Sequence, residues 1–295
     1  MNNIKNIINY YYELKIKEFK KKEDHFVFLI DNIMYDFLPF YGDVNELHKN
    51  YLTILNHGKY CHEIIFNKDK NIITYYINIP HILIKKNIFI NNRLTIKEIL
   101  TYDIPVYESK IINWKSLWKN KVDYYESQIN QLSFKYKKLS DCFDYYMGLT
   151  ETAISLLNYV DFTKLTYHIC HKRINNSQEL DEFFNPVNII IDNRVRDIAE
   201  FIKILYLKES IEVKIIMDYI LNLNFSYEEI LLFLSRLLYP SYFFDVYDKI
   251  IQEKISEEKI EYYTKKNESY ESFLKTIYNY FKINYKIPEI EWLEF

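Results

Sequence analysis

Two short segments contain the residues whose types could do chemistry. The segment His168–Ile174 holds two histidines and a cysteine, which can serve as metal ligands, bases or nucleophiles. The segment Asn185–Lys203 resembles a buried strand, a polar turn and an amphipathic helix that opens with charge. It contains the carboxylates Asp192 and Asp197, and oxygen ligands of this kind hold divalent cations.

The spacing of the histidines and the cysteine does not indicate a metal site or a cysteine nucleophile with a histidine base. His168 and His171 are spaced three apart, but no further Cys, His or Glu cluster accompanies them. Cys170 and His171 are adjacent, and adjacent side chains of a strand point to opposite faces. We therefore expect no metal at these histidines and no Cys–His nucleophile.

Composition indicates a globular protein without a nucleic-acid partner. The chain has 295 residues, of which 49% are hydrophobic and 27% are charged, enough for two lobes with cores of their own. Its net charge of −3 gives no case for nucleic acid, and without a basic groove its 30 tyrosines do not indicate base stacking.

Cysteine usage and hydropathy indicate a cytoplasmic chain. Cys61, Cys142 and Cys170 lack the CxxC spacing of a zinc site, and an odd number of cysteines argues against a disulfide framework. The first residues lack the apolar core of a signal peptide, and no run approaches the roughly 18 apolar residues of a membrane helix. We expect a soluble, cytoplasmic protein without a membrane span.

The first hundred residues alternate between helical and strand patterns. Apolar spacing followed by lysines predicts a helix over Asn2–Lys22, and Asp43 with Glu46 predicts a capped helix running to about Leu55. Asp-Asn between two apolar runs predicts a first hairpin, and a polar stretch at 67–71 predicts a second hairpin. The expected strands are His25–Ile30, Ile33–Phe40, Glu63–Phe66, Ile72–Ile77 and His81–Lys85.

From about Trp114 onward, the sequence is dominated by amphipathic helical patterns. A strand at Val187–Ile191 interrupts them, and Ser226 with Glu229 forms the signature of a capping box. The expected helices are Trp114–Leu132, Asp141–Tyr159, Arg194 to about Lys208, Ile211–Leu221, Tyr227–Leu238, Tyr242–Lys254 and Ser269–Phe281.

This order of elements resembles the protein-kinase-like fold in its aminoglycoside-phosphotransferase branch. The resemblance implies an α+β, two-lobed fold: an antiparallel-sheet N-terminal lobe (residues 1–88), a connector (89–113) and a helical C-terminal lobe (114–295). The chain most resembles the spore-coat-associated kinase-like proteins of Firmicutes, the CotS/YutH group, over about residues 110–205. The resembling motifs are Trp114-x-x-Leu117-Trp118 followed by Asp123 and Glu126, Tyr145-Tyr146-x-Gly148-Leu149-x-Glu151-x-Ala153-Ile154, Cys170-His171-x-Arg173, and Asp192-x-x-x-Arg196-Asp197-Ile198-Ala199-Glu200.

The residues that phosphoryl transfer would need are missing from the matching positions. No glycine lies between His25 and Phe40 to approach phosphates, and the strand Ile33–Phe40 has no lysine. Lys85 and Lys86 follow too late, near the expected connector, so Glu46 lacks a partner. The loop normally carries an Asp two residues after its His171, and this chain has Arg173 there, a permanent cation that cannot accept a proton.

Weak candidates remain for a cofactor site. Asn175, Asn176 or Asn188 could mimic the loop asparagine of the family, and Asp192 is the candidate for its metal-binding aspartate. For Asp192, capping of the following helix is the expected role, because the family's own pattern places the metal ligand earlier in the chain.

The charged start of the last segment is expected to be an internal anchor. Asp197 is placed in the first turn of a helix, where the helix dipole favours a carboxylate. Arg196 or Arg173 is expected to pair with a nearby carboxylate. We therefore predict no catalytic residues, a degenerate loop at His171 and Arg173, and a structural anchor at Arg196 and Asp197.

These residues and the resemblance lead to two hypotheses about function. The first is a pseudokinase without a cofactor, which binds spore-coat or other proteins and is associated with the spore or with sporulation. The alternative is an active phosphotransferase that uses ATP and Mg²⁺ with non-standard residues, in which Asp192 or Asp197 holds the metal and Lys172 or Arg173 binds the phosphates.

Overall fold

The computed structural model describes residues 2–22, 25–86, 93–107, 112–174 and 180–294. These residues form two compact units. The first unit comprises residues 1–105 and 169–191, and the second comprises residues 106–168 and 192–295. The lobe and connector boundaries expected from the sequence stay a prediction.

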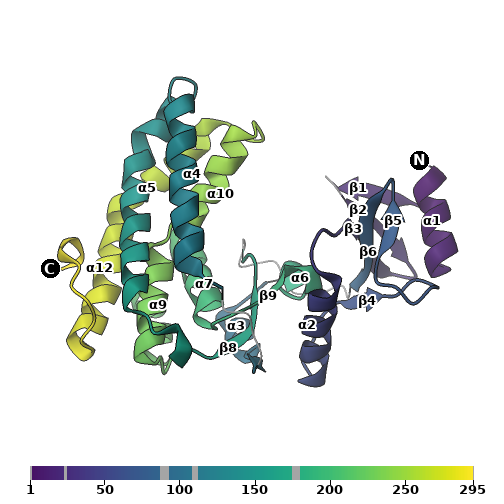
Figure 1. The fold of residues 1–295 in the computed structure, drawn as a ribbon, viewed down its shortest axis with the longest axis horizontal. Coiled ribbons are helices and arrows are strands. Elements are labelled where there is room, and N and C mark those ends of the chain that lie inside the picture. The colour runs from purple at the N-terminus through teal and green to yellow at the C-terminus, as the bar shows by residue number, and fades with distance from the viewer. Residues whose placement is uncertain (1, 23–24, 87–92, 108–111, 175–179, 295) are drawn as a thin grey trace. The chain divides into compact units, whose positions relative to one another are not determined.

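The first unit is built around an antiparallel sheet of order β1-β2-β3-β6-β4, with β5 also paired to β6 (Figure 1). The antiparallel sheet expected for the N-terminal lobe is confirmed. Within residues 1–105, the elements of the first unit are α1 (Asn2–Tyr12), β1 (Phe19–Lys22), β2 (His25–Ile30), β3 (Ile33–Pro39), α2 (Val44–Asn56), β4 (Glu63–Ile65), β5 (Thr74–Tyr76), β6 (Ile79–Lys86) and α3 (Ile96–Thr101).

The first predicted hairpin, between β2 and β3, is confirmed. Asp31 and Asn32 form its turn with φ angles of 50° and 62°, and Ile30 pairs with Ile33. Two successive positive φ angles give the type I′ turn whose twist matches that of the strands. Asp and Asn tolerate this conformation, so the turn forms without glycine.

Two expectations for the first hundred residues were wrong. The helix predicted over Asn2–Lys22 ends at Tyr12, and the edge strand β1 follows it. The second predicted hairpin does not form, because β4 and β5 both pair with β6. The tight turn instead lies at Ile77 and Asn78, whose φ angles are 49° and 59°. Helix α3, which begins with a capping box between Thr95 and Glu98, falls in the expected connector.

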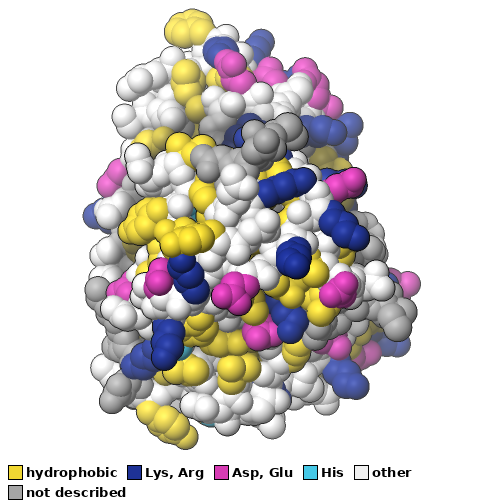
Figure 2. Space-filling model, turned by 90° about the vertical axis from the view of Figure 1, so that its right-hand side faces the viewer, with side chains coloured by type: hydrophobic (Ala, Val, Ile, Leu, Met, Phe, Trp, Pro, Cys, Tyr) yellow, Lys and Arg dark blue, Asp and Glu magenta, His cyan; other side chains and the backbone are white. Residues whose placement is uncertain are grey.

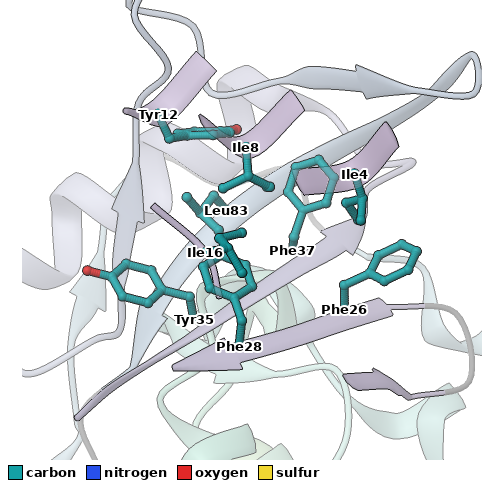
Figure 3. Packing of buried hydrophobic residues seen from close by; sticks show 9 residues of the cluster. All are labelled: Ile4, Ile8, Tyr12, Ile16, Phe26, Phe28, Tyr35, Phe37 and Leu83. Carbon is teal, nitrogen blue, oxygen red and sulfur yellow. The ribbon is translucent and has the colours of Figure 1, made fainter. Parts of the chain in front are cut away.

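The core of the first unit lies between α1 and one face of the sheet (Figure 3). Ile4 and Ile8 of α1 point toward Phe37 and Leu83, and all four side chains are at most 3% exposed. Burial of such side chains supplies the main stabilisation of the unit, about 1.5–3 kcal/mol for each.

Residues 169–191 also belong to the first unit. They contribute to a second sheet of order β7-β8-β9. The strands of this sheet are β7 (Pro105–Val106), β8 (Tyr167–His171) and β9 (Ile189–Asp192). Between β8 and β9 lie α6 (Leu180–Phe183) and the 3-10 turn η3 (Pro186–Asn188).

The second unit consists mainly of helices, as predicted. Helix α4 and helix α9 have the bounds expected from the sequence, and α5 packs against both of them (Figure 1). The helices are α4 (Trp114–Leu132), α5 (Lys137–Leu156), α7 (Val195–Leu207), α8 (Val213–Leu221), α9 (Tyr227–Leu238), α10 (Ser241–Ile251), α11 (Glu261–Thr264) and α12 (Asn267–Asn284). The 3-10 turns are η1 (Leu157–Tyr159), η2 (Phe162–Lys164), η4 (Glu257–Ile260) and η5 (Glu291–Leu293).

Stacked aromatic rings fill the core of the second unit. Tyr146 of α5 stacks on Phe243 of α10 with ring centres 4.0 Å apart, and Trp118 of α4 stacks on Tyr239 at 4.2 Å. Many of the tyrosines therefore belong to the core, where their rings contribute large apolar areas. No helix within the described ranges has the length and hydropathy needed to span a membrane.

The surface shown in Figure 2 carries mixed charge. Lysine and arginine side chains are interspersed there with aspartate and glutamate side chains. This mixing agrees with the small net charge of the chain. A basic groove, which would attract nucleic acid, is not formed on that face.

Candidate functional site

Asp192, the last residue of β9, is held by two arginines. Its Oδ2 atom accepts a hydrogen bond from Nη1 of Arg196 in α7 at 3.1 Å and from Nη2 of Arg236 in α9 at 2.6 Å. The side chains of all three residues are at most 8% exposed. Charge-assisted hydrogen bonds between buried groups are strong, so the two arginines hold the carboxylate of Asp192 in the protein interior.

The two guanidinium groups share an aromatic neighbour. The central carbons of Arg196 and Arg236 lie 4.7 Å and 4.6 Å from the ring centre of Trp114. A desolvated cation beside a tryptophan ring gains about 2 kcal/mol. Asp192 and Trp114 therefore both compensate the burial of the two guanidinium groups, and together these four side chains form the arginine clamp of the second unit.

Asn193 makes the interactions at the start of α7 that were expected of Asp192. The Oδ1 atom of Asn193 accepts a hydrogen bond from the N–H of Val195 at 3.0 Å, and its Nδ2 atom donates to the carbonyl of Thr166. Asp192 accepts instead from the N–H of Asn193, through Oδ1. The short side chain of Asn193 thus connects the first turn of α7 with the segment before β8.

A second arginine pair joins the start of α7 to α9. Nε of Arg194 donates to Oε1 of Glu229 at 2.9 Å, and Nη2 donates to Oε2 at 3.2 Å. Burial alone would raise the pKa of Glu229, but the hydrogen bonds from Arg194 and from the N–H of Ser226 hold it below its usual value. Glu229 also completes the predicted capping box with Ser226, which is confirmed.

Asp197 lies in the first turn of α7, as expected, and is 7% exposed. The positive end of the helix dipole favours a carboxylate at this position. Three charged residues, Arg196, Asp197 and Glu200, lie in the first two turns of α7, and Arg194 directly precedes the helix.

The loop residues His171, Arg173 and Asn188 belong to the first unit. His171 is 1% exposed, and its ring stacks on that of Phe183 with centres 4.0 Å apart. Asn188 accepts a hydrogen bond from the N–H of Arg173 and donates to the carbonyls of Arg173 and Glu182. The amide of Asn188 is therefore occupied by the backbone of the loop itself. Asn175 and Asn176 lie outside the described residues.

Sequence reasoning missed a buried ion pair in the first unit. Nζ of Lys86, at the end of β6, lies 2.6 Å from Oδ2 of Asp36 in β3, and both side chains are 7% exposed. The Oδ1 atom of Asp36 is buried and has no hydrogen-bond partner within the described part of the chain. Strand β3 is the strand in which phosphoryl transfer would need a lysine. It carries Asp36 instead, and the carboxylate of Asp36 is paired with Lys86.

His62 lies close to this ion pair and is fully buried. Its Nδ1 atom is 3.0 Å from the hydroxyl of Tyr60, and its Nε2 atom is 3.1 Å from the carbonyl of Asp181. Burial and the nearby ammonium of Lys86 lower the pKa of His62 to about 4, so its ring is neutral at physiological pH. A neutral histidine here links the residues before β4 to α6.

The described residues offer no metal centre. Within the ranges that the structure covers, no three His, Cys, Asp or Glu side chains converge as a metal ion would require. The cysteines are free thiols, and burial raises the pKa of Cys61 to about 12, which leaves that thiol unreactive.

Solved structures with the same fold are small-molecule kinases. An aminoglycoside phosphotransferase from Alicyclobacillus acidocaldarius subsp. acidocaldarius DSM 446 superposes with a TM-score of 0.67, covering 94% of this chain and 96% of that chain at 8% identity. The choline kinase LicA from Streptococcus pneumoniae superposes with a TM-score of 0.55, covering 92% of this chain and 98% of that chain at 11% identity. At such low identity these likenesses show the fold alone, and the predicted kinase-like fold is confirmed.

Sequence comparison identifies the family. The chain is 25% identical over 212 residues to the endospore coat-associated protein YutH of Bacillus subtilis (strain 168). That match spans 62% of this chain and 62% of the relative, less than two thirds of the relative's length. The model of the family described as spore coat putative kinase YutH matches residues 5–277. The chain belongs to this spore coat kinase-like family, as the sequence motifs indicated.

Proposed function

We propose that this protein is a catalytically inactive member of its kinase-like family and that it has a structural or binding role in the spore coat or in sporulation. The observation that carries the proposal is the arginine clamp at Asp192. Oδ2 of Asp192 is bound by two guanidinium groups, at 3.1 Å and 2.6 Å.

Phosphoryl transfer requires carboxylates that hold a metal ion against the phosphates of a nucleotide. A divalent cation could reach Asp192 only by displacing Arg196 or Arg236, and the remaining guanidinium would repel it. The clamp therefore opposes metal binding by both occupancy and charge. We assign Arg196 and Asp197 to anchoring α7, with Asp192 as the partner of Arg196.

The other positions that would serve catalysis support the same proposal. Arg173 stands where the family carries the proton acceptor, and a guanidinium group does not act as a base. His171 is buried against Phe183, away from solvent. Strand β3 carries the carboxylate of Asp36, paired with Lys86, and no lysine that could bind phosphates. These three features affect different contributions to catalysis, so restoring one of them would not restore activity.

A link to the spore is supported by the family description and by the name of the Bacillus subtilis relative. We propose that the chain is made in the cytoplasm and assembles with coat proteins, without a cofactor. A fluorescent fusion expressed in sporulating Bacillus subtilis tests this role. Fluorescence should gather around the developing spore, and a uniform signal throughout the cytoplasm would contradict it.

The absence of catalysis has its own test. Purified protein incubated with Mg²⁺ and γ-labelled ATP should release no more phosphate than a buffer blank, with or without aminoglycosides or choline. The Arg173→Asp variant should stay inactive as well, because it leaves the arginine clamp and Asp36 unchanged. Turnover by the wild-type protein that disappears in Asp192→Asn would favour the alternative, a phosphotransferase that uses ATP and Mg²⁺.

A further inference from the structure

Helices α4 and α5 enclose a surface groove of about 420 Å³ within the second unit. The buried side chains of Ile129, Phe143 and Met147, all at most 6% exposed, form its apolar floor. The exposed carboxylates of Glu126 and Glu151 lie among its lining residues. A groove with an apolar floor and a charged rim fits a side chain that has an aliphatic stem and a charged end.

Gly148 opens this groove. It lies in the interior of α5, and a Cβ atom built at its position would meet no atom within 4 Å apart from its chain neighbours and the backbone of its own helix. Glycine in a helix costs about 1 kcal/mol relative to alanine, and no close neighbour here requires it. A bare stretch of helix backbone lets another main chain approach closely. The glycine is one of only three in the chain, and it belongs to the motifs that carry the family resemblance.

The negative charge of the carboxylates around the groove indicates which class of partner would bind there. Glu126, Asp144 and Glu151 line the groove, and none of them forms an ion pair with any residue that the structure describes. These carboxylates do not converge on one point as ligands of a metal ion do. A partner that complements them must therefore carry several positive charges spread along its length.

We propose that this groove, the α4–α5 groove, docks a lysine- or arginine-bearing segment of a partner protein. The aliphatic stems of the basic side chains would lie on the apolar floor, and their charged ends would meet the three carboxylates. The open backbone at Gly148 favours a polypeptide over a small organic cation, because it leaves room for a second main chain. The inference names a partner class for the proposed binding role and does not depend on whether nucleotide binds.

Titration of the full-length protein against a labelled synthetic helical peptide of leucine and lysine tests this docking. The wild-type protein should bind this peptide and should not bind the matched peptide of leucine and glutamate. The double variant Glu126→Gln/Glu151→Gln should bind about tenfold more weakly. Its control, Asp123→Asn/Asp141→Asn, removes two exposed carboxylates of the same helices outside the groove and should bind like the wild type.

A second variant tests shape independently of charge. Gly148→Leu fills the groove and keeps every carboxylate, so it should lose peptide binding while its unfolding midpoint stays at or above that of the wild type. The proposal is overturned if the wild-type protein does not bind the lysine peptide or if the control double variant loses as much affinity as the groove variant. It is also overturned if spermidine binds in the groove and the peptide does not. Any of these results would leave the proposed lack of catalysis standing, since that rests on nucleotide assays.

Discussion

Nη2 of Arg236 lies 2.6 Å from Oδ2 of Asp192, although 44 positions separate the two residues in the chain. The contact fastens α9 to the last residue of β9, and both side chains are at most 4% exposed. A buried charge that loses its partner is costly, because it must stay desolvated without compensation. The contact is therefore expected to hold the helical unit together.

Replacing Arg236 with methionine should lower the free energy of unfolding by about 3 kcal/mol, because Asp192 keeps only one guanidinium partner. Urea unfolding followed by circular dichroism measures the change. Lys135→Met provides the control, because Lys135 and its partner Glu253 are both exposed, and its midpoint should hardly move. Equal effects of the two substitutions would mean that the clamp does not stabilise the fold.

The ion pair of Asp36 and Lys86 should behave as a buried pair does. Asp36→Leu should cost about 3–5 kcal/mol, because it leaves the ammonium of Lys86 buried without a partner. The double variant Asp36→Leu/Lys86→Met should regain most of this loss, because it replaces both charges by apolar groups. If the double variant is as unstable as the single variant, the two charges stabilise the sheet by some other interaction.

His62 should make the protein sensitive to mild acid. Burial and Lys86 lower its pKa from 6.5 to about 4, so the unfolded chain binds a proton more readily than the folded chain between these values. The stability that His62 contributes is complete above pH 6.5 and is lost as the pH falls toward 4. Between pH 6.5 and pH 5 the loss amounts to about 2 kcal/mol.

Unfolding measured at pH 7.5 and pH 5 tests this dependence on His62. The wild-type protein should lose about 2 kcal/mol more than His62→Gln over this interval. His57→Gln changes an exposed histidine at the end of α2 and should keep the wild-type profile. If His62→Gln is as sensitive to acid as the wild type, other groups cause the sensitivity.

Gly148→Ala should stabilise the protein. The helix gains about 0.5–1 kcal/mol when alanine replaces an interior glycine, and the added methyl group meets no neighbour within 4 Å. Thermal unfolding should show a raised midpoint. A lowered midpoint would indicate that the α4–α5 groove is closed in solution.

Local signals in the sequence were sufficient for several elements of the fold. The Asp31-Asn32 turn and the capping box of Ser226 and Glu229 each depend on residues within a few positions, and both were predicted correctly. The pairing of β4 and β5 was not, because the two strands pair with successive stretches of β6, and this long-range register leaves no local signal. Helix α3 was missed although Thr95 and Glu98 carry its cap signal, since only six residues follow the cap.

Only those contacts of the candidate site that join residues close in the sequence could be predicted. The pairing of Arg196 with a nearby carboxylate could be expected, because Asp192 lies only four positions before it in the chain. Arg236 and Trp114 complete the clamp from distant helices, and nothing in their local sequence indicates this. Lys86 was judged too late in the chain to matter, yet strand pairing places it beside Asp36.

The most direct test of the account is a thermal shift of the full-length protein with ATP and Mg²⁺. A protein that binds nucleotide at 100 times its dissociation constant gains about 2.7 kcal/mol and unfolds at a higher temperature. We predict no shift up to millimolar ATP and Mg²⁺, for the wild type and for Asp192→Asn alike. A clear shift in the wild-type protein that Asp192→Asn abolishes would contradict the account, because Asp192 would then hold a metal ion and the arginine clamp would open for it.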